Sequence, residues 1–240
     1  HLSIRRQRQM CIRDRGNTLG EFAIDTGIEE NILVIGDSSG KSTLLRNMIH
    51  RISEGIPPSD AKLLVIDYRR QLLGECPATH LAGYASTKQD VQEFISQLVP
   101  LLESRMPAGV DDPQTLRDRS WWKGPDIFLV VDDYDLVATS SGNPLQGLLE
   151  LLPYGRDIGL HMVVARRCTG FSRTSFEPIM ARLRELHPTI FLMSGTAEEG
   201  IIAGGRKARS LSKGRADVIS NQGTHQVVQF AHHVGEEKTE

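Results

Sequence analysis

A glycine-rich turn, Gly36 to Gly40, leads directly into Lys41, Ser42 and Thr43. In such loops the lysine reaches the outer phosphates of a nucleotide, and the hydroxyl that follows it takes a magnesium ion. The backbone N–H groups of the turn and the positive end of the next helix bind phosphate oxygens. The spacing therefore predicts an ATP and Mg²⁺ site, with Ser42 as a metal ligand and a nucleotide loop made of Gly36, Asp37, Ser38, Ser39, Gly40, Lys41, Ser42 and Thr43.

The loop is one residue shorter than the usual pattern, G-x-x-x-x-G-K-[ST]. Only Asp37, Ser38 and Ser39 separate its two glycines. A deletion removes one N–H group from the cradle and shifts the others, so we expect weaker or altered binding rather than its loss. The alternative is a strand-to-helix turn without a ligand, which Gly-Lys-Ser-Thr after an apolar run disfavours.

Two carboxylates end the second informative segment, Ile127–Asp133, which reads IFLVVDD. Its apolar run is typical of a strand buried on both faces, whose carboxyl end lies where open α/β sheets bind ligands. We predict Asp132 to be the magnesium carboxylate. Asp133 stands where many ATPases keep a glutamate that orients the attacking water, so it is a candidate catalytic residue at a degenerate position. A helix N-cap or a surface turn is the alternative reading of such a pair.

Strands alternate with helices along the chain, which predicts an α/β fold with a mostly parallel sheet and helices on both faces. The pattern is that of a P-loop NTPase. The expected strands are Leu19–Ile24, Asn31–Ile35, Lys62–Asp67, Ile127–Asp132, Gly159–Ala165 and Thr189–Met193, with a closing β-hairpin at Val218–Ser220 and Gln226–Phe230. The expected helices are Lys41–Ile52, Lys88–Glu103, Pro113–Arg119, Leu145–Leu152 and Ser175–Leu186.

Composition limits the classes of partner. The 240 residues carry a net charge of −2 and only 5% aromatic residues, so neither a basic field nor stacking platforms are available and no nucleic acid is expected. The three cysteines lack metal-binding spacing and fit a reducing compartment. No run of about 20 apolar residues or signal peptide is visible, which predicts a cytoplasmic protein.

Domain limits follow from composition. Residues 1–17 are polar and basic without a period, which predicts a disordered leader or linker that need not be native. Residues 18–231 are expected to form one ATPase domain, and residues 232–240 a frayed tail.

Several other features could serve a site or only the fold. Arg69-Arg70 and Arg166-Arg167 each follow an expected strand, where they could face the ligand, although surface ion pairs are the simpler reading. We expect the pair Trp121-Trp122 to pack a loop or domain edge, with a partner contact as the alternative. His161 lies in an expected strand and is expected in the core.

Long stretches of the chain resemble one protein family. SWWKGPDIFLVVDDYDLVATSSGNPLQGLLELLPYGRDIGLHMVVARR is very similar to the last ATPase domain of the EccC proteins, the FtsK/SpoIIIE-type motor ATPases of actinobacterial type VII secretion. VIDYRRQLLG, RLRELHPTIFLMSGTAEEG and the KGRA turn share the similarity, which covers roughly residues 18–231.

The resemblance implies a RecA/FtsK-like fold and a place in a hexameric motor that exports small helical WXG100-type proteins. Expected partners are the other ATPase domains of the motor and the C-terminal signal of its substrates, with membrane contact only through the assembled complex at the inner face of the cell membrane. In family terms Gly36, Gly40, Lys41 and Ser42 carry over as the nucleotide loop, and Asp132 as the magnesium carboxylate. The last ATPase domain is often degenerate as a catalyst.

The chain also departs from the motor pattern. FtsK-type motors tend to carry Thr-Gln after the strand that follows the carboxylates, and an arginine before the next strand. Those places read Arg166-Arg167 and Pro188-Thr189 here. The favoured hypothesis is a nucleotide-binding module with weak or absent hydrolysis that serves substrate recruitment or regulation. An active hydrolase in a hexameric secretion motor is the alternative, and an FtsK-like DNA translocase is the third reading.

Overall fold

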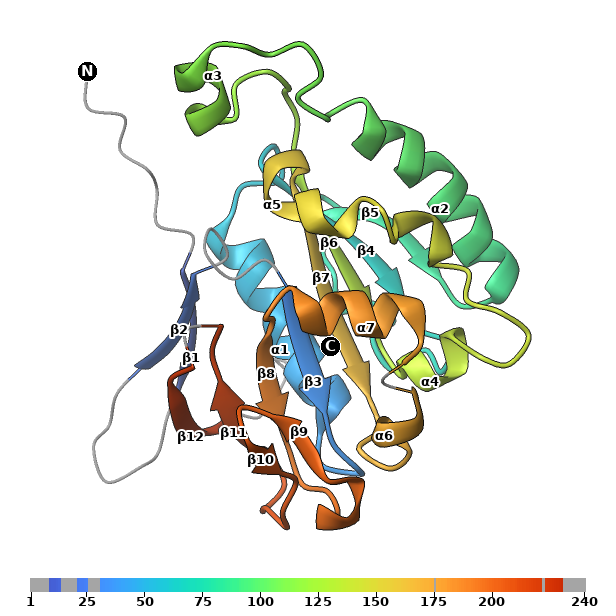
Figure 1. The fold of residues 1–240 in the computed structure, drawn as a ribbon, viewed down its shortest axis with the longest axis vertical. Helices are drawn as coiled ribbons and strands as arrows, with labels where there is room; N and C mark the ends of the chain where they lie inside the picture. Colours follow the sequence, from blue (N-terminus) through green and yellow to red (C-terminus); the bar gives the residue numbers. More distant parts are fainter. Residues whose placement is uncertain (1–8, 14–20, 26–30, 175, 222, 231–240) are drawn as a thin grey trace, which may run out of the picture.

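An eight-stranded sheet forms the centre of the computed structural model, which describes residues 9–13, 21–25, 31–174, 176–221 and 223–230. Its strand order is β12-β11-β8-β3-β7-β6-β4-β5 (Figure 1). Strands β3 to β8 run parallel, and β11 pairs antiparallel with β8 and β12 at one edge. The strands are β3 (Asn31–Ile35), β4 (Ala61–Ile66), β5 (Leu81–Ala85), β6 (Asp126–Val131), β7 (Leu160–Arg166), β8 (Thr189–Leu192), β11 (Arg215–Ile219) and β12 (His225–Gln229). The predicted fold class, with its closing hairpin, is confirmed.

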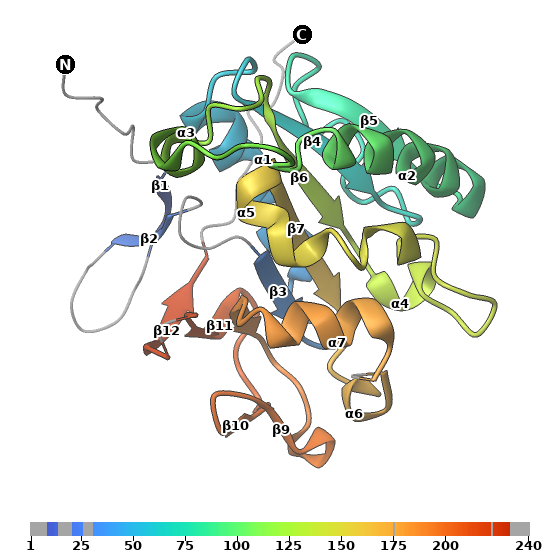
Figure 2. The ribbon, with the colours of Figure 1, turned by 45° about the horizontal axis from the view of Figure 1, so that its top comes forward.

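Both faces of the sheet are covered, which explains the near-continuous apolar strands. Along β3, Ile32 and Val34 pack into one core, and Leu33 and Ile35 pack into the other. Helix α1 (Lys41–Gly55) covers the first face through residues such as Leu44. Figures 1 and 2 show α2, α5 and α7 on the opposite face. The bounds are α2 (Lys88–Glu103), α3 (Pro113–Asp118), α4 (Tyr134–Val137), α5 (Gly155–Ile158), α6 (Phe171–Thr174) and α7 (Pro178–Glu185).

Prolines account for two differences from the expected helices. Instead of one helix over Leu145–Leu152, the chain forms the 3₁₀ turns η1 (Gln146–Leu148) and η2 (Leu152–Tyr154). Pro153 disfavours helical geometry at Leu152, the last residue of the expected helix. Helix α7 begins at Pro178 because a residue before proline is disfavoured in helical geometry, and the Glu177 carboxylate accepts from the next two N–H groups.

Besides β1 (Gln9–Arg13), the strands β5, β9 and β10 were not expected from the sequence. In β5, Gly83 leaves room for the Phe94 ring, since a Cβ there would lie 2.6 Å from its Cζ atom. A glycine at this point weakens the strand signal that a sequence carries. The strands β9 (Ile201–Ala203) and β10 (Arg206–Lys207) form a separate pair after the 3₁₀ turn η3 (Ala197–Glu199).

Part of the expected leader has a described backbone. Strand β1 (Gln9–Arg13) pairs antiparallel with β2 (Glu21–Asp25), which overlaps the strand expected at Leu19–Ile24. The rest of the leader, residues 1–8 and 14–17, and the expected frayed tail, residues 232–240, lie outside the described residues. Among the helices that the structure describes, none has the length and apolar character needed to cross a membrane.

Candidate nucleotide-binding site

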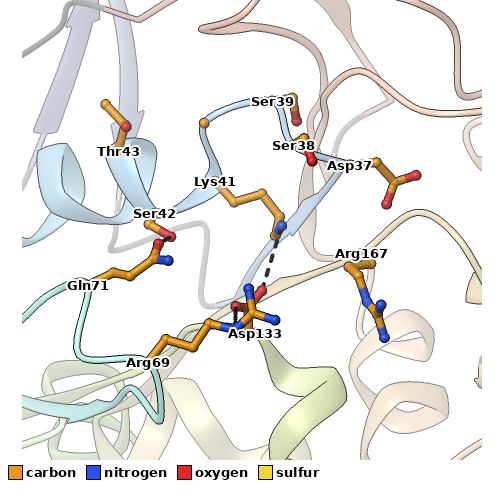
Figure 3. Close-up of a pocket in the computed structure, with 11 residues that line it drawn as sticks. Asp37, Ser38, Ser39, Lys41, Ser42, Thr43, Arg69, Gln71, Asp133 and Arg167 are labelled. Atoms are coloured by element: carbon orange, nitrogen blue, oxygen red, sulfur yellow. Dashed lines mark hydrogen bonds and ion pairs between the residues drawn. The ribbon is translucent and has the colours of Figure 1, made fainter.

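The glycine-rich loop and the carboxylate strand meet at one edge of the sheet. Strand β7 lies between β3 and β6, so the loop after β3 and the carboxylates after β6 face each other across its carboxyl end. A cavity of about 340 Å³ opens there (Figure 3). It is lined by Asp37, Ser38, Ser39, Gly40, Lys41, Ser42, Thr43, Arg69, Gln71, Asp133 and Arg167.

The loop backbone has the geometry of an anion cradle. Ser38 (φ 47°) and Gly40 (φ 99°) adopt left-handed conformations, and Ser39 between them does not. Such alternation turns successive N–H groups to one side. Among the described residues, no acceptor is found for the backbone N–H groups of positions 38–43. These six donors belong to residues that line the cavity at a helix N-terminus, an arrangement that fits a chain of phosphates.

Gly36 is required by close packing. A Cβ atom there would lie 2.5 Å from Ser39 Oγ and 2.6 Å from Met193 Cβ. The Gly36 N–H group donates to the Arg166 carbonyl at 3.2 Å, and that of Asp37 donates to the Ser194 carbonyl at 2.8 Å. The start of the loop is thus fastened to the end of β7 and to the segment after β8, although it is one residue short.

The side chains of Asp37 and Ser39 are respectively bound to a neighbouring connection and buried. The Asp37 carboxylate accepts from the N–H group of Cys168 at 3.1 Å and from the Thr169 hydroxyl at 2.9 Å, so it ties the phosphate loop to the β7–α6 connection. Ser39 is buried, and its hydroxyl has no hydrogen-bond partner among the described residues. Because the Asp37 carboxylate is hydrogen-bonded and the Ser39 side chain is buried, the two residues can contact a nucleotide through their backbone.

Ser42 and Asp132 lie together at the expected metal position. Ser42 Oγ lies 2.6 Å from Asp132 Oδ2 and 2.7 Å from Gln71 Oε1, and its single proton can serve one of these acceptors at a time. Burial raises the pKa of the Asp132 carboxyl, while the hydrogen bond from Ser42 opposes that rise. A cation beside Asp132 would favour its charged form.

A magnesium ion at this point would need help from the phosphates. Within the described residues, no group of three or more His, Cys, Asp or Glu side chains is placed to hold a metal. Mg²⁺ is ordinarily bound through one or two carboxylates together with substrate phosphates. Asp132 and the Ser42 hydroxyl supply the protein's share of such a site, so the residues present fit the ion.

Asp133 is held by two cations. Its carboxylate lies 3.7 Å from Lys41 Nζ and 3.2 Å from Arg69 Nε (Figure 3). Its backbone is left-handed, with φ 46°, at the start of α4. The structure thus brings Lys41, Ser42, Asp132 and Asp133 together as the sequence indicated. Gln71 was missed, because nothing but its place just after a buried strand marks it in the sequence.

The arginine pairs divide between the cavity and the core. Arg69 and Arg167 line the cavity, whereas Arg70 does not. Arg166 is only 1% exposed, donates to Asp135 Oδ1 at 2.9 Å, and has its pKa lowered by burial. It is therefore a core residue, contrary to the possibility that both members of its pair face the ligand.

The remaining candidates serve packing. The indole N–H groups of Trp121 and Trp122 donate to the carbonyls of Arg105 and Asp157, and the Arg105 guanidinium lies 4.2 Å from the Trp122 ring centroid. His161 is buried and stacks on Phe128 with 4.5 Å between ring centroids. The expectation that these residues pack loops and core is confirmed.

Comparison with known proteins finds close relatives, although no family model matches. The chain is 46% identical over 210 residues to the ESX-4 secretion system protein EccC4 of Mycobacterium tuberculosis, which covers 87% of the chain. It is 39% identical over 217 residues, 90% of the chain, to the ESX secretion system protein EccC of Thermomonospora curvata. The chain belongs to the EccC family. It spans 17% and 16% of the lengths of these two relatives.

Solved structures of EccC share its fold. The cytoplasmic domain of the Thermomonospora curvata type VII secretion ATPase EccC matches 95% of the chain with a TM-score of 0.91 and 38% identity, and the chain covers 26% of it. A structure of ATPases 2 and 3 of the same EccC, in complex with a signal sequence peptide, matches 96% of the chain at a TM-score of 0.91 and 37% identity, with 42% of that structure covered. The resemblance to the C-terminal EccC ATPase domain is confirmed.

Proposed function

We propose that this EccC-type domain binds Mg-ATP as a stabilising ligand, hydrolyses it slowly or not at all, and helps to recruit proteins for export. The observation that carries the proposal is the pairing of Asp133 with Lys41 and Arg69 beside the phosphate loop. A site that binds phosphate but lacks a free carboxylate to orient the attacking water favours nucleotide binding over hydrolysis.

Binding is supported by the charges and donors at the cavity. The N–H groups of positions 38–43 would hold the phosphate chain, and Lys41 would bind its outer oxygens. Ser42 and Asp132 would hold Mg²⁺, which supplies charge neutralisation between phosphate oxygens. The Ser42 hydroxyl can keep its proton on Gln71 or Asp132 while a lone pair of its oxygen takes the ion.

Slow hydrolysis is supported by two side chains. Asp133 is one methylene shorter than the glutamate common at this place, and a displacement of about 1 Å can cost roughly a hundredfold in rate. Arg166, where related motors tend to carry Thr-Gln, is buried in an ion pair with Asp135 rather than facing the phosphates. Neither residue is free to order an attacking water.

Steady-state hydrolysis by the purified protein should be slower than ~1 s⁻¹ at saturating Mg-ATP, below the typical range of phosphoryl-transfer enzymes such as kinases. A coupled phosphate-release assay measures it, and the Lys41→Ala variant reports contaminating ATPase activity. Turnover above that rate in the wild type, absent from the variant, would favour the alternative of an active hydrolase in a hexameric motor.

Recruitment is supported by the relatives. One EccC structure that is 37% identical to this chain holds a signal sequence peptide. By analogy, this domain would take the C-terminal signal of a WXG100-type pair and work beside other ATPase domains of one motor, reaching the inner face of the membrane through the assembled complex. The net charge of −2 disfavours the DNA-translocase reading.

A pull-down tests recruitment. The immobilised domain should retain a cognate WXG100-type pair with an intact C-terminal signal and release the same pair once the signal is truncated. Equal retention of both forms, or of neither, contradicts the recruitment role and leaves the nucleotide site untouched. Salt-sensitive binding of duplex DNA in the same format would instead support the translocase reading.

A further inference from the structure

The Arg69 side chain lines the cavity from outside the nucleotide loop. Its Nε atom pairs with Asp133 Oδ2 at 3.2 Å, while the side chain remains 56% exposed at the cavity wall. Among the described residues, its two terminal Nη groups have no partner. We propose that Arg69 binds the outermost phosphate of ATP from within the same chain, and that Asp133 is the positioning residue that holds it there.

The segment that carries Arg69 is fixed at its base. Asp67, just after β4, is buried and accepts from the Leu72 N–H group at 2.6 Å and from the Tyr84 hydroxyl at 2.8 Å. Arg46 of α1 donates to the Gln71 carbonyl at 3.1 Å. The backbone on both sides of Arg69 is therefore held in place, and its long side chain can adjust without unfolding the segment.

The charges around Asp133 indicate what happens when a bound phosphate draws Lys41 away from this carboxylate. Lys41 makes the longer of the two contacts, 3.7 Å, and is the residue that phosphate oxygens would attract. When Lys41 leaves, Arg69 can keep its Nε contact and offer its Nη groups to the phosphate, because a guanidinium binds several acceptors at once. Asp133 thus keeps a cation beside it, and its negative charge does not face the phosphate alone.

The position of Lys41 indicates which phosphate Arg69 meets. Lys41 and Arg69 approach the same carboxylate, so the phosphate that takes Lys41 from Asp133 is also the one within reach of Arg69 (Figure 3). That is the outer end of the chain of phosphates. Arg69 should therefore favour ATP over ADP. This inference rests on the proposed nucleotide binding.

The test compares the affinities of fluorescent ATP and ADP analogues, with Mg²⁺, for the full chain and its variants. Arg69→Ala should weaken ATP binding about tenfold and leave ADP within about twofold, since one charge-assisted contact is lost. Arg70→Ala is the matched control, because Arg70 is the adjacent exposed arginine and does not line the cavity. The melting temperature without nucleotide should be the same for both variants.

The role of Asp133 has its own variant. Asp133→Asn suits the left-handed backbone, which asparagine tolerates, and removes only the charge. It should lower the ATP-to-ADP preference in the same direction as Arg69→Ala, by about threefold. If Asp133 acted only by repelling phosphate, this variant would bind ATP more tightly, which would overturn its positioning role.

Failure of the inference and failure of the proposed function give different results. An unchanged ATP-to-ADP ratio in Arg69→Ala, with tight binding retained, refutes the role of Arg69 and leaves the nucleotide site standing. Lys41→Ala should weaken both nucleotides. Absence of binding by the wild type would refute the proposed function and, with it, the role of Arg69.

Discussion

Replacing Asp135 by alanine should lower the free energy of unfolding by about 3–5 kcal/mol, the cost of leaving a buried charge without its partner. Arg166 is 1% exposed, and its guanidinium donates to Asp135 Oδ1 at 2.9 Å. The Arg167 N–H group also donates to Asp135, at 2.8 Å. Urea denaturation followed by circular dichroism measures the loss.

Two control variants distinguish the loss of this buried ion pair from the effect of removing any charged side chain. Glu54→Ala breaks an exposed pair with Arg51, 3.1 Å long, and should change stability by less than about 0.5 kcal/mol. The double variant Asp135→Leu with Arg166→Met should be less destabilised than Asp135→Ala, because apolar side chains need no partner. A loss below about 1 kcal/mol in Asp135→Ala would contradict a buried, uncompensated Arg166.

Lys41→Ala should abolish the stabilisation that Mg-ATP confers. A ligand at a hundred times its dissociation constant adds about 2.7 kcal/mol, which for a chain of this size raises the melting temperature by roughly 5–10 °C. Lys41 is the cation at the cavity that lies on the phosphate loop itself. Differential scanning fluorimetry with and without Mg-ATP shows the change.

The Lys41 experiment carries its own control. Without nucleotide, Lys41→Ala should melt close to the wild type, because its pair with Asp133 is long, at 3.7 Å, and Arg69 still neutralises that carboxylate. An equal Mg-ATP shift in both proteins would mean that the nucleotide stabilises the chain from somewhere other than the cradle.

The fold and the core of the site could be predicted because both depend on local sequence. Buried parallel strands carry apolar runs, and the loop after Ile35 and the carboxylates after Val131 follow such runs directly. Parallel strands place their carboxyl ends at one edge, so Lys41 and Asp132 had to converge. Helix α2 was predicted with its observed bounds from the helical period of its apolar residues, and the structure shows a capping box of Thr87 and Asp90 at its start.

Contacts between distant segments could not be read from the sequence. Ser42 and Gln71 meet only because the connection after β4 passes over the start of α1. Arg69 and Arg166 both follow or end strands, yet one lines the cavity and the other pairs with Asp135 in the core. Arg69 pairs with Asp133, just before α4, and Arg166 pairs with Asp135 within α4, contacts that neither residue's neighbours in sequence reveal.

A crystal structure of the full chain with Mg²⁺ and a non-hydrolysable ATP analogue would show whether the cavity is a nucleotide site. We expect the phosphates against the N–H groups of positions 38–43, Lys41 on the outer oxygens, and Mg²⁺ beside Ser42 and Asp132. An analogue bound elsewhere, or a lysine still paired with Asp133 in a crystal saturated with the analogue, would contradict this expectation.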